Sequence, residues 1–117
     1  MKIQIKRIYD PIAPNDGTRI LVDRLWPRGL KKETAGFAFW AKEIAPSNEL
    51  RKWYSHDYEK WNQFKAKYFA ELDKKPEGLD ELRNHLKGDV ITFVFSSKET
   101  RLNNANALKE YIETHTL

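Results

Sequence analysis

The 117-residue chain contains no cysteine, and this absence excludes several chemistries at once. Without a thiol the chain has no disulfide framework, no thiolate nucleophile, no iron–sulfur cluster and no cysteine-type zinc site. It also lacks a run of about eighteen apolar residues, and its first ten residues alternate polar and apolar side chains where a signal peptide has an unbroken apolar run. We therefore expect a soluble cytoplasmic protein without a membrane partner.

Histidine is sparse as well, and its positions do not suggest catalysis or metal binding. The three histidines, His56, His85 and His115, lack the spacing of a metal site, and Ser55, His56 and Asp57 are too close in sequence for a catalytic triad. No Walker loop or glycine-rich dinucleotide turn is present. We expect no metal and no cofactor.

The charge that is present is unevenly distributed. The chain has 21 Lys and Arg against 17 Asp and Glu, a formal charge of +4. Residues 1–32 hold eight of these cations and three of the acids, a local charge of +5, whereas residues 33–117 are nearly neutral. These cations either keep the solvent faces of two strands soluble, or form a surface that attracts anions.

Three segments have the pattern of β-strands. Residues 2–9 alternate, and the apolar runs 18–25 and 90–95 are typical of strands covered on both faces, the second of them a central parallel strand. Residues 10–17, with two prolines and an Asn-Asp-Gly turn, predict a loop. Residues 30–45 show no clear periodicity, so their conformation and role are left open.

Helix signals dominate the second half of the chain. Ser47 is the expected N-cap of a short helix, and Asp57 precedes the longest apolar stripe. Another helix is expected to start at Pro76 and to end before Gly88, and a last one over residues 102–112.

This order of elements predicts the α/β class. Strands come first, then helices, then one more strand and helix, without an internal repeat or linker. We expect a single compact domain over residues 1–117, with a small, mostly parallel sheet flanked by helices.

The loop after residues 90–95 is the first candidate site, because loops at the carboxyl ends of parallel strands hold ligands in open α/β sheets. Its hydroxyls and cations lie near a helix N-terminus, where free N–H groups favour phosphate or carboxylate: Ser96, Ser97, Lys98 and Arg101. The alternative is that Thr100 caps the helix and the two cations are solvated.

Residues 23–29 follow the other apolar strand and form the second candidate. A carboxylate at this depth is costly unless paired, so we expect Asp23 to cap the turn, to pair with Arg24 or Arg28, or to act as a base. Trp26 lies between these arginines and could line a pocket. If the two strands are neighbours in the sheet, both segments converge on one cleft.

Three stretches together resemble the YeaO-like family of small bacterial proteins, a family of unknown function. They are RILVDRLWPRGLKK, WAKEIAPSNELRKW and TFVFSSKETRLNNANALKEYI. The resemblance implies a compact α/β fold with the first and third stretches in one sheet. Longer relatives look similar but carry a Cys- or His-bearing segment after the second strand, and family members often show Asn-His or another polar pair where this chain has Asn103 and Asn104. Neither a thiol nor an imidazole is available there, but asparagine amides both donate and accept hydrogen bonds and can hold a ligand.

The leading hypothesis is a protein that binds a phosphate- or carboxylate-bearing small molecule. Arg24 and Arg28 would bind the anion from one side, the loop that starts at Ser96 from the other, and Asp23 would orient an arginine or act as base. If the protein is an enzyme, these groups allow phosphoryl or acyl transfer without a covalent thiol. The alternatives are a nucleic-acid-binding module that uses residues 1–32 with Trp26 stacking, and an interaction protein without a ligand of its own. Oligomeric state is not determined.

Overall fold

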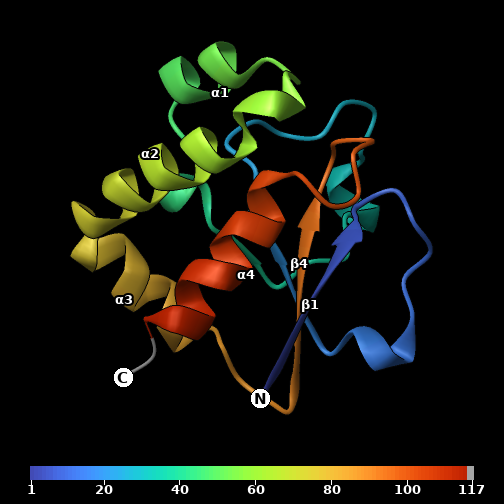
Figure 1. Cartoon of the computed structure of the whole chain (residues 1–117). Coiled ribbons are helices and arrows are strands. Elements are labelled where there is room, and N and C mark those ends of the chain that lie inside the picture. The colour runs from blue at the N-terminus through green and yellow to red at the C-terminus, as the bar shows by residue number, and fades with distance from the viewer. Residues whose placement is uncertain (116–117) are drawn as a thin grey trace.

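A four-stranded sheet forms the centre of the computed structural model, which describes residues 1–115 (Figure 1). The strands are β1 (Lys2–Arg7), β2 (Thr18–Leu21), β3 (Phe39–Trp40) and β4 (Val90–Phe95). Their spatial order is β1-β4-β2-β3, and every pairing is parallel. The apolar run of β4 therefore lies in the middle of the sheet, and the α/β prediction is confirmed.

One face of this sheet is covered by the α-helices. They are α1 (Asn48–Tyr54), α2 (Trp61–Asp73), α3 (Pro76–Asn84) and α4 (Asn104–Thr114). Because successive strand residues point to opposite faces, Ile91, Phe93 and Phe95 of β4 all join the core shared with the helices. Figure 1 shows α4 crossing this face. None of the helices in the described part of the chain combines the length and hydrophobicity needed to cross a membrane.

Within residues 1–115 the opposite face of the sheet is covered without an α-helix. Leu21 and Val94 pack there with Ile8 and with partly buried side chains of the segment whose conformation the sequence left open: Leu30, Phe37 and Trp40. This segment contains β3 and two short 3-10 turns, Lys32–Thr34 and Lys42–Ile44. The expected flanking by helices thus holds for one face, and an aromatic loop replaces them on the other.

The helix starts show which caps were predicted correctly. The Ser47 hydroxyl accepts the Leu50 N–H at 3.1 Å, which confirms it as the N-cap of α1. Asp57 caps a short 3-10 turn, Tyr58–Lys60, that leads directly into α2. The last helix begins later than expected, because Asn103, and not Thr100, caps α4 by accepting the Asn106 N–H at 2.9 Å.

The second strand is shorter than predicted. β2 ends at Leu21, and the last bond of its ladder runs from the Val22 N–H to the Val94 carbonyl at 3.1 Å. The chain turns away at Asp23, whose carboxylate bonds across to Ser96 beyond the end of β4. This turn creates the space in which the candidate site lies.

Candidate functional site

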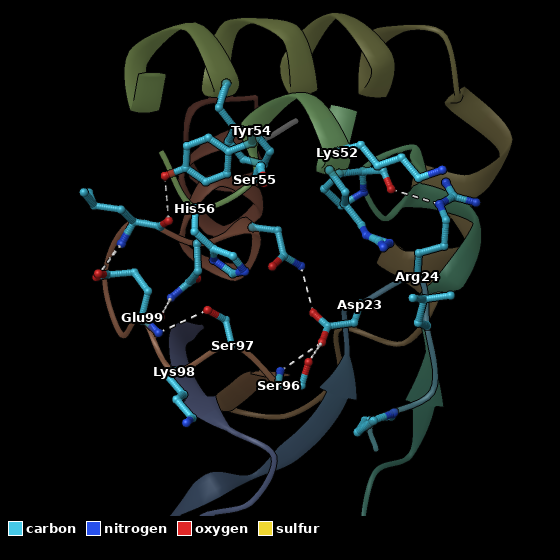
Figure 2. Close-up of a pocket in the computed structure, with 18 of the residues that line it drawn as sticks. Asp23, Arg24, Lys52, Tyr54, Ser55, His56, Ser96, Ser97, Lys98 and Glu99 are labelled. Atoms are coloured by element: carbon cyan, nitrogen blue, oxygen red, sulfur yellow. Dashed lines mark hydrogen bonds between the residues drawn. The ribbon is translucent and has the colours of Figure 1, made fainter. Parts of the chain in front are cut away.

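The segments that follow β2 and β4 converge on one pocket, as expected if these strands were neighbours. Leu21 pairs with Val94, so the two strands end side by side. A pocket of about 880 Å³ opens beyond them, bounded by both loops and by the turn after α1 (Figure 2). All the side chains predicted for the site line this pocket except Arg101, which is exposed and outside the lining.

Asp23 joins three elements at the floor of the pocket. Its Oδ2 accepts the Ser96 N–H at 2.9 Å and the Ser96 hydroxyl at 2.7 Å, and its Oδ1 accepts the Asn104 amide at 3.0 Å (Figure 2). The same Asn104 amide donates to the Val22 carbonyl at 2.9 Å. The expected pairing of Asp23 with an arginine does not form within residues 1–115. Asp23 instead connects the end of β2 to the end of β4 and the start of α4.

Arg7 at the end of β1 orients the loop after β4, a role that the sequence analysis missed. Its Nε donates to the Ser97 carbonyl at 2.9 Å and its Nη2 to the Ser96 carbonyl at 3.3 Å. In a trans peptide the N–H points opposite to the carbonyl, so the N–H groups of Ser97 and Lys98 point away from Arg7. Among residues 1–115 neither of these two N–H groups has a hydrogen-bond acceptor. Adjacent free N–H groups of this kind are suited to an anion.

Arg24 is engaged by the protein itself. Its Nε donates to the Pro46 carbonyl at 2.9 Å and its Nη2 to the Ala45 carbonyl at 2.8 Å. Figure 2 shows the guanidinium directed toward this segment and away from Ser96 and Ser97. The carbonyls precede α1 and belong to no strand, which explains why a cation is drawn to them. The two-arginine arrangement expected around one anion is therefore not preformed, and anion contact by Arg24 stays a prediction.

Trp26 and Arg28 lie on the same turn but in different environments. The Trp26 indole N–H donates to the Leu30 carbonyl at 2.8 Å, and its ring packs against Phe37 and Trp40 with centroid distances of 5.7 and 5.6 Å. Trp26 thus lines the pocket while its ring belongs to the aromatic cover of the sheet. Arg28 is exposed at the pocket edge.

The pocket has more positive than negative charge. It is lined by two carboxylates, Asp23 and Glu99, and by five cations: Arg24, Arg28, Arg51, Lys52 and Lys98. Glu99 accepts the N–H groups of Arg101 and Leu102 at 3.0 and 3.2 Å, and these backbone hydrogen bonds lower its pKa. Within residues 1–115 none of the five cations forms an ion pair. Figure 2 shows Lys52 and Lys98 on opposite sides of the pocket.

The turn after α1 supplies a wall that the sequence did not reveal. Ser55 and His56 are consecutive non-glycine residues with positive φ, 42° and 59°, a conformation that costs about 1–2 kcal/mol per residue. It brings the His56 ring toward the centre of the pocket (Figure 2). The preceding Tyr54 donates its hydroxyl to the Leu102 carbonyl at 3.0 Å, and burial raises the pKa of Tyr54 to about 12. No glycine or other local signal marks this turn in the sequence.

Half of the cations in the basic N-terminal third are bonded within the protein. Lys6 and Arg19 both pair with the buried Asp16, while Arg7 and Arg24 bond to backbone carbonyls. The count of eight cations in residues 1–32 therefore overstates how many of them are free to contact a ligand.

Comparison with known proteins places the chain among small bacterial relatives. It is 41% identical over 114 residues to the uncharacterized protein YeaO of Escherichia coli, covering 97% of this chain and 99% of that protein. It is 36% identical over 111 residues to the uncharacterized protein Rv3073c of Mycobacterium tuberculosis, covering 95% of this chain and 93% of the relative. No solved structure matches the chain significantly. The family model described as the inactive DUF488-N3 subclade matches residues 2–117, so the chain belongs to this family, DUF488-N3i, and its resemblance to YeaO is confirmed.

Proposed function

We propose that this domain binds a small molecule bearing a phosphate or carboxylate group in the pocket at the carboxyl ends of β2 and β4. The observation that carries the proposal is the excess of cations over carboxylates in the pocket, with both carboxylates already hydrogen-bonded to the protein. A concave site lined by one sign of charge attracts the opposite sign. The N–H groups of Ser97 and Lys98 add two donors for an anion on the side of the loop opposite Arg7.

The role that we propose is binding without turnover. Both oxygens of Asp23, the candidate base, accept hydrogen bonds from the protein. The hydroxyls of Ser96 and Ser97 are also engaged, the first as a donor to Asp23 and the second as an acceptor from the Glu99 N–H at 3.1 Å. The description of the family as an inactive subclade agrees with this role.

A nucleic-acid-binding module receives less support from the arrangement of the side chains. Two of the cations of residues 1–32, Lys6 and Arg19, pair with the buried Asp16, and Trp26 is packed against two other rings. Affinity for RNA or DNA that falls steeply with salt would favour that alternative over the small-molecule site.

The test is calorimetric titration and thermal unfolding with inorganic phosphate, methyl phosphate and acetate. Binding to the folded state alone raises the unfolding temperature in proportion to the logarithm of ligand concentration above the Kd. We expect saturable binding by at least one probe, and about tenfold weaker binding in Arg28→Ala and Lys52→Ala, since each removes a charge-assisted contact.

The matched control is Lys32→Ala, which removes an exposed cation of the same N-terminal third from outside the pocket. This variant should bind as the unmodified protein does. If it weakens binding as much as Arg28→Ala does, the effect is one of overall charge and the pocket assignment fails. Absence of binding by all three probes at millimolar concentration would contradict the proposed function itself.

A further inference from the structure

The pocket combines its cations with apolar and aromatic side chains that are exposed to solvent. Within residues 1–115 few large hydrophobic side chains are exposed, and two of them, Leu25 at 57% and Tyr58 at 37%, line this pocket. Leu25 comes from the loop after β2, and Tyr58 from the turn after α1. Exposed apolar groups beside a concave site are typical of ligand contacts.

Aromatic rings form the wall that faces the anion-binding loop. Tyr58 packs edge-on against Tyr54 and His56, with ring centroids 6.0 and 6.3 Å away. Figure 2 shows Tyr54 across the pocket from Ser96 and Ser97, with the His56 side chain between them. A ligand whose anionic group lies at the N–H groups of Ser97 and Lys98 would therefore direct the rest of its structure toward these rings.

The volume of the pocket is large enough for an organic ligand. At about 880 Å³ it falls within the roughly 300–1,000 Å³ of sites that enclose organic molecules, far more than a free phosphate ion needs. Rings offer a further gain, because aromatic pairs in edge-to-face or offset contact attract each other beyond the area they bury.

From this arrangement we infer that the ligand is an aromatic anion: a phosphate monoester or carboxylate attached to a planar ring. The inference rests on the proposed function and deepens it. The anionic group binds at the loop after β4 and the pocket cations, and the ring packs against the exposed apolar and aromatic side chains of the pocket, Leu25 and Tyr58.

Pairs of probes that share a charged group and differ in the attached body test the inference. Titration calorimetry compares phenyl phosphate with methyl phosphate, and benzoate with acetate, while glycerol phosphate supplies a larger but polar body. We expect the aromatic member of at least one pair to bind about tenfold or more tightly than its partner. Glycerol phosphate should bind no better than methyl phosphate.

Variants identify the residues that hold the ring. Leu25→Ala and Tyr58→Ala should each remove much of the aromatic advantage and leave the affinity for methyl phosphate or acetate unchanged. Ile12→Ala is the matched control, since Ile12 is 59% exposed but outside the pocket. Tyr58→Leu removes the ring but keeps a smaller apolar side chain, so it provides a second variant if the alanine variant folds poorly.

The outcomes separate this inference from the proposed function. If phenyl phosphate and methyl phosphate bind equally, as do benzoate and acetate, the aromatic inference is overturned while the anion site stands. If the aromatic advantage survives in both Leu25→Ala and Tyr58→Leu, the ring lies elsewhere and the inference is again overturned. If no probe binds, both proposals fail.

Discussion

Replacing Asp23 with alanine should destabilise the fold and not merely alter the pocket. The carboxylate accepts the Ser96 N–H, the Ser96 hydroxyl and the Asn104 amide, so it ties together β2, β4 and α4 at the point where β2 leaves the sheet. Its loss leaves these three donors without their shared acceptor. The prediction therefore distinguishes a connecting role for Asp23 from the role of a base that only a substrate would engage.

The magnitude follows from the number of bonds and from their setting. A hydrogen bond to a charged group contributes about 1.5–3 kcal/mol. The three bonds at Asp23 share one carboxylate that is only partly buried, so they are not additive, and water replaces part of what is lost. We expect Asp23→Ala to lower the free energy of unfolding by about 2–3 kcal/mol. This loss is a substantial part of a typical domain stability of about 5–15 kcal/mol. It corresponds to a fall of roughly 10 °C in the unfolding temperature.

Urea unfolding followed by the fluorescence of the four tryptophans measures this loss directly. Asp23→Asn should lower the free energy of unfolding by a similar amount, because asparagine keeps the shape of the side chain but turns an NH₂ group toward the Ser96 or Asn104 donors. A double-mutant cycle with Asn104→Ala should give a coupling energy of about 1 kcal/mol. Asp80→Ala is the matched control: its carboxylate is 76% exposed in a surface ion pair, and its loss should change stability by less than about 0.5 kcal/mol.

The connecting role of Asp23 is contradicted if the unfolding free energy of Asp23→Ala lies within about 0.5 kcal/mol of that of the unmodified protein, the size of effect expected for an ordinary surface substitution. It is also contradicted if the cycle with Asn104 shows no coupling, since the two side chains would then act independently. Unchanged stability together with loss of a ligand-dependent reaction would return Asp23 to the role of catalytic base.

Two further variants test buried polar groups. The buried Tyr68 hydroxyl donates to the Ile44 carbonyl at 2.7 Å, and burial raises the pKa of Tyr68 above its usual range. Tyr68→Phe should therefore lower the free energy of unfolding, measured in urea, by about 1–3 kcal/mol. No change would show that water replaces the bond. For Asp16, burial alone would raise the pKa, but hydrogen bonds and the cations Lys6 and Arg19 outweigh it and hold the pKa below the ordinary 3.8. Ionised Asp16 therefore stabilises the fold fully above pH 3.8. The difference in unfolding free energy between the unmodified protein and Asp16→Asn should stay constant from neutral pH to that value and shrink below it. A difference that is undiminished in stronger acid would contradict the lowered pKa of Asp16.

The sheet and the convergence of the site were predictable because both depend on local patterns. The apolar run that became β4 has the composition of a strand buried on both faces, and parallel strands necessarily end at the same edge. Once β2 and β4 were neighbours, the polar residues that follow them had to share one region. The position of the site therefore follows from the order of the strands, whatever hydrogen bonds its side chains form.

The remaining features depend on contacts between distant segments, which local patterns do not encode. Residues 30–45 have no period of their own, because their side chains divide between the two faces of the sheet: Phe37 and Trp40 pack on one, Phe39 and Ile44 on the other. The turn at Ser55 and His56 contains no glycine, so its left-handed backbone is imposed by the packing around it. Arg24 was correctly placed at the pocket, but its bonds to the Ala45 and Pro46 carbonyls arise only when the segment before α1 returns to the end of β2.

The charge of the pocket also depends on contacts that the sequence pattern does not encode, and this bears on function. Counting by segment located the positive charge in residues 1–32, yet several of those cations neutralise Asp16 or bond to carbonyls. The pocket cations come from three separate places in the chain, and only the turn after β2 lies within residues 1–32; the others are helix α1 and the loop after β4. Free charge is set by pairing in the folded state, so neither the net charge nor its distribution along the sequence measures it. A discrete site assembled from such distant parts favours a compact anion over an extended polyanion, which would need its cations spread along a continuous surface.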